Sequence, residues 1–279
     1  MSLKNILENW SAYRKGAEEG GHHQYEHQWG MAIDLDLCIG CNACSTACYA
    51  ENNLAVVGPE KFAKNQGMYW MRIERYWDQM DEEFSEQGAS FLPMLCQNCH
   101  AATCEPVCPV AATYHTPDGL NAQVYNRCIG SRYCSNNCPY RVRYFNFYSY
   151  YESSWPAPLH MQLNPDITVR DKGVMEKCTF CVQRIREAKD KAKMENRSVR
   201  DGDVVTACAQ ACPTQAIVFG DTMDPESRVA KLWRKHQVHR GPYTQRKPKT
   251  DPELRGYRIF EELNVDPSIM YLERVREEV

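Results

Sequence analysis

The sequence has no long hydrophobic run. Its 279 residues are 43% hydrophobic and 25% charged, and the mean hydropathy is -0.61. A membrane-spanning helix needs roughly 18 or more consecutive, mainly apolar residues, and no stretch of this chain approaches that length. We therefore expect that the chain does not cross a bilayer by itself.

The sequence also lacks an excess of positive charge. It has 33 Lys and Arg residues against 36 Asp and Glu residues, a formal net charge of -3. Non-specific binding to nucleic acids depends on a basic surface, so this balance argues against a nucleic-acid partner. No Gly-rich phosphate loop, catalytic triad or open metal site is visible either. We therefore name no catalytic residue.

No export signal is visible at the start of the chain. The first ten residues contain no apolar segment of signal-peptide length, and Arg14-Lys15 is not a twin-arginine signal. This absence leaves the compartment open, because a partner with a signal can carry a cofactor-loaded subunit across a membrane.

Cysteine, in contrast, is abundant and clustered. The chain has 15 cysteines in four groups, and the first group has the C-x2-C-x2-C-x3-C spacing of bacterial ferredoxins. The groups are Cys38, Cys41, Cys44 and Cys48; Cys96, Cys99, Cys104 and Cys108; Cys128, Cys134 and Cys138; and Cys178, Cys181, Cys208 and Cys212. Four groups of this kind predict four iron–sulfur clusters, and iron as the metal bound by the cysteines.

Disulfides and zinc fit the cysteines less well than iron–sulfur clusters do. A disulfide framework is typical of small secreted chains, whereas this chain is long, its cysteine count is odd, and C-x2-C pairs close very short loops. Zinc takes four tetrahedral ligands, and two C-x2-C pairs would supply one such site. Groups of three cysteines followed by a remote Cys-Pro favour interleaved clusters over zinc.

The ferredoxin pattern also predicts how the groups share their ligands. In two-cluster bacterial ferredoxins the fourth cysteine of a run binds the other cluster. Applied to nested pairs of groups, this rule predicts three [4Fe-4S] sets: Cys38, Cys41, Cys44 and Cys212; Cys178, Cys181, Cys208 and Cys48; and Cys96, Cys99, Cys104 and Cys138. The fourth set is Cys128, Cys134 and Cys108.

The fourth set lacks one thiolate. Cys38-Ile39-Gly40-Cys41 aligns with Cys128-Ile129-Gly130-Ser131, so Ser131 occupies the position of the missing ligand. A cuboidal cluster held by three cysteines tends to lose its unprotected iron and persist as [3Fe-4S]. We therefore predict three [4Fe-4S] clusters and one [3Fe-4S] cluster.

The expected fold class is α+β, with two nested bacterial-ferredoxin-like dicluster units, extended loops and a docking tail. Residues 1–30 should form an N-terminal arm, in which His22, His23 and His27 are solvated or contact a partner. The cluster core spans residues 31–220, with an inner dicluster unit at about 91–150 inserted in the outer unit. Residues 221–279, which contain no cysteine, should form a C-terminal docking extension.

Local patterns predict short elements around the cysteines. Helical turns are expected at residues 44–51 and 106–111, and helices at 182–196, at 270–276 and from the Asp224-Pro225 step to about His236. Strands are expected at residues 29–34, 70–76, 123–125, 216–220 and 256–263.

Aromatic and basic residues follow the third group. The aromatic residues between 133 and 155 fit either an interface with a membrane subunit or a shell that buries the clusters. Arg132, Arg141 and Arg143 could offset the negative charge of reduced clusters, and ordinary surface pairing explains them equally well.

Longer stretches resemble a known family. Residues 31–41, 92–99, 104–109 and 176–181 resemble the four-cluster electron-transfer subunits of molybdopterin-type membrane oxidoreductases. Residues 128–147 are similar to the corresponding stretch in the quinone reductase complex of sulfate-reducing bacteria and in the iron–sulfur part of alternative complex III. The resemblance covers about residues 29–220, and it too implies three [4Fe-4S] clusters and one [3Fe-4S] cluster.

The resemblance implies a non-catalytic electron-transfer subunit of a respiratory-chain complex. Its partners would be a polysulfide-reductase-type integral-membrane quinone subunit, a molybdopterin-oxidoreductase-like subunit and a multihaem cytochrome c. The chain would then be peripheral to the membrane, on the periplasmic face by way of a partner's export signal, with the cytoplasmic face still open. A soluble polyferredoxin-like electron carrier is the alternative, and a zinc-stabilised scaffold with no redox role is a second.

Overall fold

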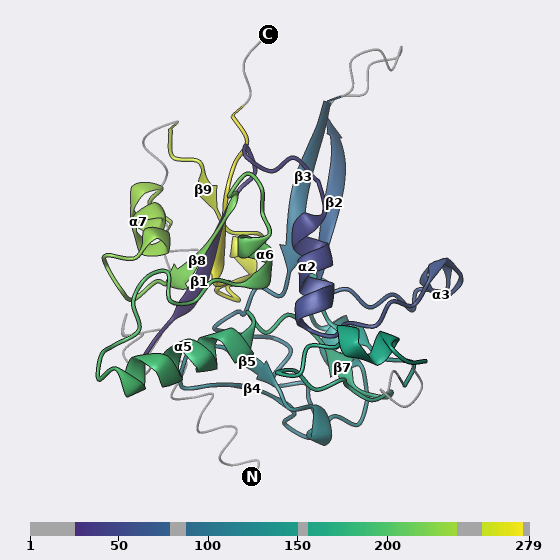
Figure 1. The fold of residues 1–279 in the computed structure, drawn as a ribbon. Helices are drawn as coiled ribbons and strands as arrows, with labels where there is room; N and C mark the ends of the chain where they lie inside the picture. Colours follow the sequence, from purple (N-terminus) through teal and green to yellow (C-terminus); the bar gives the residue numbers. More distant parts are fainter. Residues whose placement is uncertain (1–25, 79–87, 150–155, 239–252, 276–279) are drawn as a thin grey trace, which may run out of the picture.

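A mixed sheet of four strands lies at the centre of the computed structural model, which describes residues 26–78, 88–149, 156–238 and 253–275 (Figure 1). The strand order is β8 (Ile217–Asp221), β1 (Trp29–Asp34), β10 (Ile269–Leu272) and β9 (Gly256–Tyr257). β1 runs antiparallel to β8 and parallel to β10. The sheet therefore joins segments from the two ends of the described chain.

Alternation along β1 and β10 explains how the sheet is buried on both faces. Ala32 and Met270 face helix α7 (Arg228–Lys235) and pack with its Val229 and Trp233. Met31, Ile33, Ile269 and Tyr271 belong to the larger core, which includes cysteines of all four groups. Strands buried on both faces read as continuous apolar runs. This is why residues 29–34 are recognisable in the sequence, and that predicted strand is confirmed.

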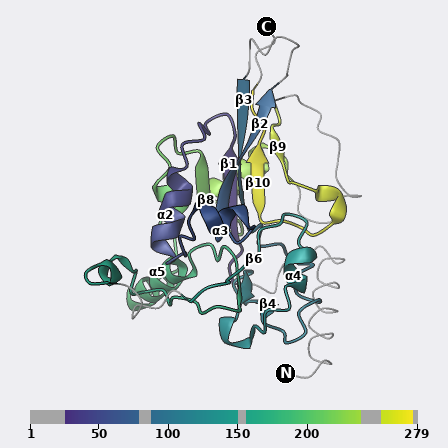
Figure 2. The ribbon, with the colours of Figure 1, turned by 90° about the vertical axis from the view of Figure 1, so that its right-hand side faces the viewer.

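A long hairpin of β2 (Met71–Asp78) and β3 (Gly88–Leu95) rises beside the sheet, and Figures 1 and 2 both show it at the end opposite β4. Its base is buried at Met71 and Leu95, whereas Tyr76 and Trp77 are exposed further up. The predicted strand at 70–76 corresponds to β2. Its partner β3 was not predicted, because Pro93 interrupts the strand pattern of that segment.

Short helices follow three of the cysteine loops. They are α2 (Ala43–Glu51), α4 (Tyr133–Asn136) and α5 (Val182–Met194), and each begins after a residue in the left-handed region, Asn42, Arg132 or Cys181. α6 (Ala207–Gln210) packs against α2. The helices predicted at 44–51 and 182–196 are confirmed, the latter ending at Met194.

The remaining elements are short and connect the loops. They are α3 (Pro59–Ala63), β4 (Thr113–His115), β5 (Asn121–Gln123), β6 (Tyr144–Phe145), β7 (Met175–Glu176) and the 3-10 turns η1 (Tyr125–Arg127), η3 (Leu159–Gln162) and η5 (Glu261–Leu263). β4 pairs with β5, and β6 pairs with β7. The architecture is thus a mixed α+β fold with few regular elements.

Several local predictions were wrong. Residues 106–111 contain the expected turns without forming a regular helix, but the strand expected at 123–125 ends at Gln123 and is followed by a 3-10 turn. α7 begins at Arg228, because Ser227 and not Asp224 accepts the capping hydrogen bond from Ala230 N. A helix was expected at 270–276, but residues 269–272 form strand β10, since this Ile-Met-Tyr-Leu segment belongs to a sheet buried on both faces, and residue 276 lies outside the described residues.

The two ends of the chain differ from a simple arm and tail. Most of the predicted arm, residues 1–25, lies outside the described residues. His27 is buried and is not part of a solvated segment. Residues 256–272 supply two strands of the central sheet, so part of the predicted docking extension belongs to the core. Within the described residues, none of the helices has both the length and the apolar character that crossing a bilayer needs.

Candidate functional site

Three cysteines of the first group meet the last cysteine of the fourth group at the loop that follows β1. Cys38, Cys41, Cys44 and Cys212 line one small cavity whose other walls include Ile73, Pro93, Pro213 and Ile217. Burial raises the pKa of Cys44 to about 11, and the neighbouring thiols of Cys38, Cys212 and Cys41 contribute in the same direction. Two segments nearly 170 residues apart in sequence therefore place four thiols around one apolar space.

A second set surrounds Cys48, one helical turn further along α2. Burial raises the pKa of Cys48 well above its usual value, and the next causes are the charges of Cys178, Cys181 and Cys208. α2 packs against α6, which carries Cys208, and this contact brings the two segments together. Phe180 N donates to Cys178 Sγ at 3.4 Å, and Asn52 Nδ2 donates to Cys48 Sγ at 3.6 Å. These donors favour thiolate over thiol.

The third set gathers around Cys99. Burial raises the pKa of Cys99 well above its usual value, and Cys96, Cys104 and Cys138 are the next contributors. Backbone amides of Tyr140 and Val142 donate to Cys138 and lower its pKa in part, although burial dominates. Here too, thiols from two separate sequence groups are neighbours.

The remaining three cysteines are one buried residue, Cys134, and two half-buried residues, Cys108 and Cys128. Cys134 is buried in a small apolar cluster with Met175, and Cys128 packs against it. Cys128 Sγ accepts from Met175 N at 3.3 Å, and Cys108 Sγ accepts from Ala112 N at 3.2 Å. Cys108 directly follows Val107, which packs on the same cluster.

The loops of the first and third groups share one backbone conformation. Gly40 and Gly130 have φ values of 69° and 72°. The helix caps two residues later, Asn42 and Arg132, have φ values of 62° and 61°. A Cβ on Gly40 would collide with Phe91, and one on Gly130 with Gly173 O. Ser131 therefore stands at the loop position of Cys41, and both residues are exposed.

These residues suit iron–sulfur clusters chemically. Thiolates are the ligands that such clusters use, and buried thiolates that repel one another need a cation between them. In the described ranges, no three His, Cys, Asp or Glu side chains converge as closely as they do around one metal ion. A cuboidal cluster does not require that convergence, because its thiolates bind different irons.

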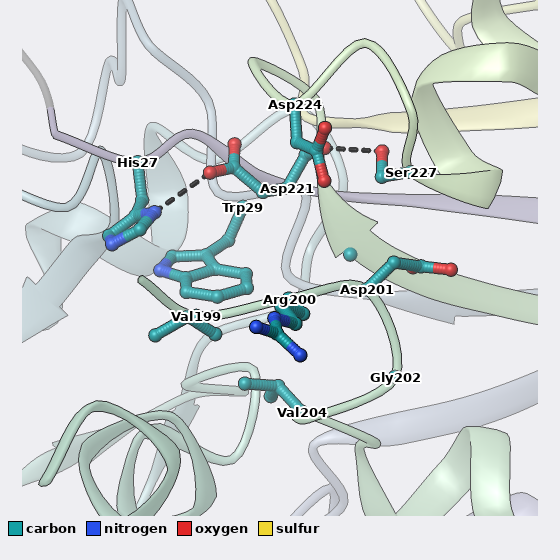
Figure 3. Close-up of a pocket in the computed structure, with 11 residues that line it drawn as sticks. His27, Trp29, Val199, Arg200, Asp201, Gly202, Val204, Asp221, Asp224 and Ser227 are labelled. Atoms are coloured by element: carbon teal, nitrogen blue, oxygen red, sulfur yellow. Dashed lines mark hydrogen bonds and ion pairs between the residues drawn. The ribbon is translucent and has the colours of Figure 1, made fainter. Parts of the chain in front are cut away.

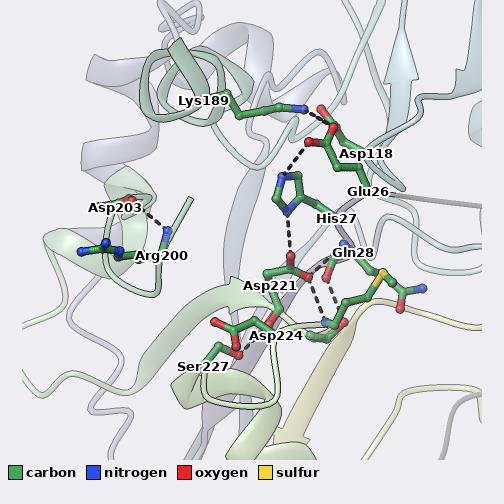
Figure 4. Close-up of polar contacts among 12 residues, drawn as sticks. Glu26, His27, Gln28, Asp118, Lys189, Arg200, Asp203, Asp221, Asp224 and Ser227 are labelled. Atoms are coloured by element: carbon green, nitrogen blue, oxygen red, sulfur yellow. Dashed lines mark hydrogen bonds and ion pairs between the residues drawn. The ribbon is translucent and has the colours of Figure 1, made fainter. Parts of the chain in front are cut away.

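A second cavity lies at the far edge of the sheet and is structural (Figure 3). His27 Nδ1 contacts Asp221 Oδ2 at 2.8 Å, and Gln28 N donates to Asp221 Oδ1 at 3.0 Å (Figure 4). Asp201 pairs with Arg228, and Ser227 Oγ donates to the backbone oxygen of Asp221. The polar groups of this cavity tie the start of β1 to the end of β8.

The aromatic segment after the third group divides between interior and surface. Tyr140 is buried and donates to Ile259 O, while the guanidinium of Arg132 stacks on Phe145. Tyr133 is 55% exposed. Tyr150, Tyr151 and Trp155 lie outside the described residues. Buried residues such as Tyr140 thus suit a shell around the clusters, and exposed residues such as Tyr133 suit an interface with a partner.

Comparisons with known proteins give one family. Residues 37–112, which contain the first two cysteine groups, match the family model described as a 4Fe-4S dicluster domain. The chain is 42% identical over 255 residues to the iron–sulfur cluster-binding subunit of menaquinone reductase from Nitratidesulfovibrio vulgaris, covering 90% of this chain and 91% of that protein.

More distant relatives have similar descriptions. Iron–sulfur subunit 1 of the Hdr-like menaquinol oxidoreductase of Archaeoglobus fulgidus is 33% identical, over 76% of this chain and 78% of its own length. The B subunit of the polysulfide reductase of Wolinella succinogenes is 28% identical, over 74% of this chain and 82% of its own length.

Proposed function

The chain belongs to the family of iron–sulfur electron-transfer subunits of molybdopterin-type oxidoreductases, and on this premise we propose that it relays electrons between a periplasmic-side partner and a quinone-interacting membrane subunit. Three [4Fe-4S] clusters and one [3Fe-4S] cluster would carry the electrons. When bound, such clusters supply one-electron transfer at potentials that the protein adjusts.

The observation that carries the proposal is the meeting of thiols from distant groups. Cys48 lies among Cys178, Cys181 and Cys208, and Cys212 lies with the first group. This exchange supports the two outer ligand sets predicted from the ferredoxin rule, in which each cluster fastens two segments of the chain. Folding and cluster assembly would then be coupled.

The proposed three-iron cluster has separate support. Its ligands would be Cys108, Cys128 and Cys134, and Ser131 would stand where the first loop has a thiolate. The matched backbone angles of the two loops support this correspondence. A cluster with three irons and three thiolates differs from a four-iron cluster in both core and ligands, and cluster type is one of the factors that set the potential.

The residues of this chain would keep the clusters dry and fixed in position. Apolar walls such as Ile73 and Ile217 line the first cavity and would limit the access of water to its inner side. Backbone amides aimed at Cys108, Cys128, Cys178 and Cys212 stabilise the anionic sulfurs without adding mobile charge. No proton-transfer residue is needed for this role.

The proposed partners follow from the relatives. The names of those proteins support a quinone, with menaquinone as the first candidate, and a partner subunit of the polysulfide-reductase type, which we propose to be integral to the membrane. We add a molybdopterin-oxidoreductase-like subunit and a multihaem cytochrome c as further partners. The chain would be peripheral to the membrane on its periplasmic face.

The ligand exchange can be tested in the cluster-loaded chain. Cys48→Ala should replace the four-iron signals of the cluster bound by Cys178, Cys181 and Cys208, about 130 residues downstream, with three-iron signals, because three thiolates remain. Thr46→Ala, an exposed position on the same helix, is the matched control and should retain every signal. Damage confined to the cluster of Cys38, Cys41 and Cys44 would contradict the proposed sets.

The assignment to a complex needs a second measurement. Purification from gently solubilised membranes should recover the chain with an integral-membrane subunit, with about fifteen iron atoms per chain. A lone soluble monomer that contains clusters would favour the free carrier. A colourless zinc protein would refute the electron-transfer proposal.

A further inference from the structure

Arg143 is a buried cation with no carboxylate among the contacts that the described residues give it. The residue is 3% exposed and lies between α4 and β6. Its Nη1 donates to Cys104 Sγ at 3.3 Å and to Asn121 Oδ1 at 3.4 Å. Its Nη2 donates to Thr113 Oγ1 at 2.8 Å and to Gln123 Oε1.

The β4–β5 hairpin holds the guanidinium in place. Thr113 begins β4, and Asn121 and Gln123 begin and end β5, so all three acceptors come from one small hairpin. The carboxylate in this neighbourhood, Glu105, is already engaged by His115 at 2.6 Å and by Asn121. The hairpin thus supplies neutral acceptors, which orient Arg143 without cancelling its charge.

An uncompensated buried charge is costly, so the site needs an anion. The thiols that act most strongly on the charge of Arg143 are Cys104, Cys134 and Cys96. The Nε of Arg143 is also buried and has no partner among the described residues. Under the proposed ligand sets, Cys104 and Cys96 belong to the third cluster and Cys134 to the fourth.

We propose that Arg143 is a positioning residue for electron transfer, which raises the reduction potentials of the third and fourth clusters through its fixed positive charge. The inference rests on the proposed ligand sets. When a cluster takes up one electron, its net charge becomes more negative by one, and Arg143 remains protonated. Its charge therefore stabilises the reduced state more than the oxidised state, and hydrogen bonds to cluster sulfurs act in the same direction.

Arg143 should raise the potentials of the third and fourth clusters by different amounts, because its contacts with their ligands differ. Arg143 donates directly to Cys104, so the third cluster should respond most. Lys177, which is fully buried and donates to Cys178 O at 3.0 Å, also acts on Cys104. The third cluster would therefore lie beside two buried cations.

Redox titration of the cluster-loaded chain, followed by electron paramagnetic resonance, tests the inference. Arg143→Gln should lower the potential of the third cluster by at least about 59 mV, a tenfold change in its one-electron equilibrium. The fourth cluster should shift less, and the two outer clusters should not shift. Arg143→Lys should retain most of the wild-type potential. Arg141→Gln, an exposed arginine two residues away, is the matched control.

A second variant covers the case in which Arg143→Gln does not assemble. Gln123→Glu keeps the acceptor oxygen for Arg143 and for Thr113 but adds a negative charge beside the guanidinium. It should lower the same two potentials with the iron content unchanged. Unchanged potentials in a fully loaded Gln123→Glu protein would overturn the inference and leave the proposed function intact. A wild-type chain that binds no cluster would overturn both.

Discussion

The loop at residues 38–44 and the loop at residues 128–134 have the same backbone and different chemistry. Both carry a glycine with φ near 70° and a left-handed residue before a helix. The first loop has Cys41, and the third has Ser131 at the same position. Local sequence similarity thus specifies one loop shape, while a single side chain changes how many thiolates that shape presents.

The surroundings of the two loops differ as well. The first loop faces an apolar cavity together with Cys212. The third loop carries Cys134, one of the thiols that act on the buried charge of Arg143. Since potential depends on ligand charge, hydrogen bonds and burial, two loops of equal shape can hold clusters of unequal potential.

The largest expected difference between the two loops follows from removing the cysteine that each cluster takes from a distant segment. Cys108→Ala would leave the third loop with two thiolates, so we expect complete loss of its cluster and a less stable fold. Cys212→Ala would leave the first loop with three, so we expect its conversion to a three-iron cluster. Iron content and low-temperature spectra of both variants check this. Equal losses in the two variants would show that Ser131 does not distinguish the loops.

Substitution of the two loop glycines, Gly40 and Gly130, should have the next largest effect. Alanine in the left-handed region costs about 1–2 kcal/mol, and a forced contact adds about 1–3 kcal/mol. Gly130→Ala would collide with a backbone oxygen, Gly173 O, whereas Gly40→Ala would meet the side chain of Phe91. We therefore expect Gly130→Ala to lower the free energy of unfolding of the loaded protein by about 3 kcal/mol and Gly40→Ala by about 2 kcal/mol. Urea titrations with the reverse order would contradict the backbone contact.

Ser131→Cys should make the two loops alike. It restores the Cys-Ile-Gly-Cys sequence of the first loop, so a fourth iron should bind and the three-iron signal should disappear. An added anionic ligand should lower the potential by about 59 mV or more, equivalent to about 1.4 kcal/mol. Mössbauer spectra count the irons, and Cys41→Ser is the reciprocal control. A four-iron cluster in the untreated wild-type protein would disprove the three-iron assignment.

The smallest expected effect is a pH dependence of the stability of β1, the strand that precedes the first loop. The hydrogen bond to Asp221 is the main factor that raises the pKa of His27 above its usual 6.5, so its contribution to stability is complete below pH 6.5. That contribution, about 1 kcal/mol for a hydrogen bond, should be lost as pH rises through the folded-state pKa. The protection factors of the β1 amides in hydrogen exchange should therefore fall as the pH rises through the folded-state pKa. The protection factors of the third loop should not change over this range.

His27→Gln supplies the control for that titration. It removes the titrating group at a site whose side chain is 11% exposed. In this variant the protection factors of the β1 amides should no longer change with pH above pH 6.5. An unchanged pH profile in this variant would assign the effect to another group.

The sequence was sufficient for features that depend on neighbouring residues. The cysteine groups, the strand at 29–34 and the helix from Val182 could be predicted, because spacing and periodicity are properties of contiguous residues. The position of Ser131 could be found by aligning two loops of the same chain. The ferredoxin rule also predicted which distant thiols to look for near Cys48.

Features of a second kind were decided by packing between distant segments. Ile269–Leu272 has an apolar pattern compatible with a helix, and only pairing with β1 makes it a strand. Arg141 and Arg143 look alike in sequence, yet one is exposed and the other is enclosed by the β4–β5 hairpin. The spacing of residues along a chain is local, whereas burial and the counter-charge of a buried group depend on residues brought from elsewhere by the fold.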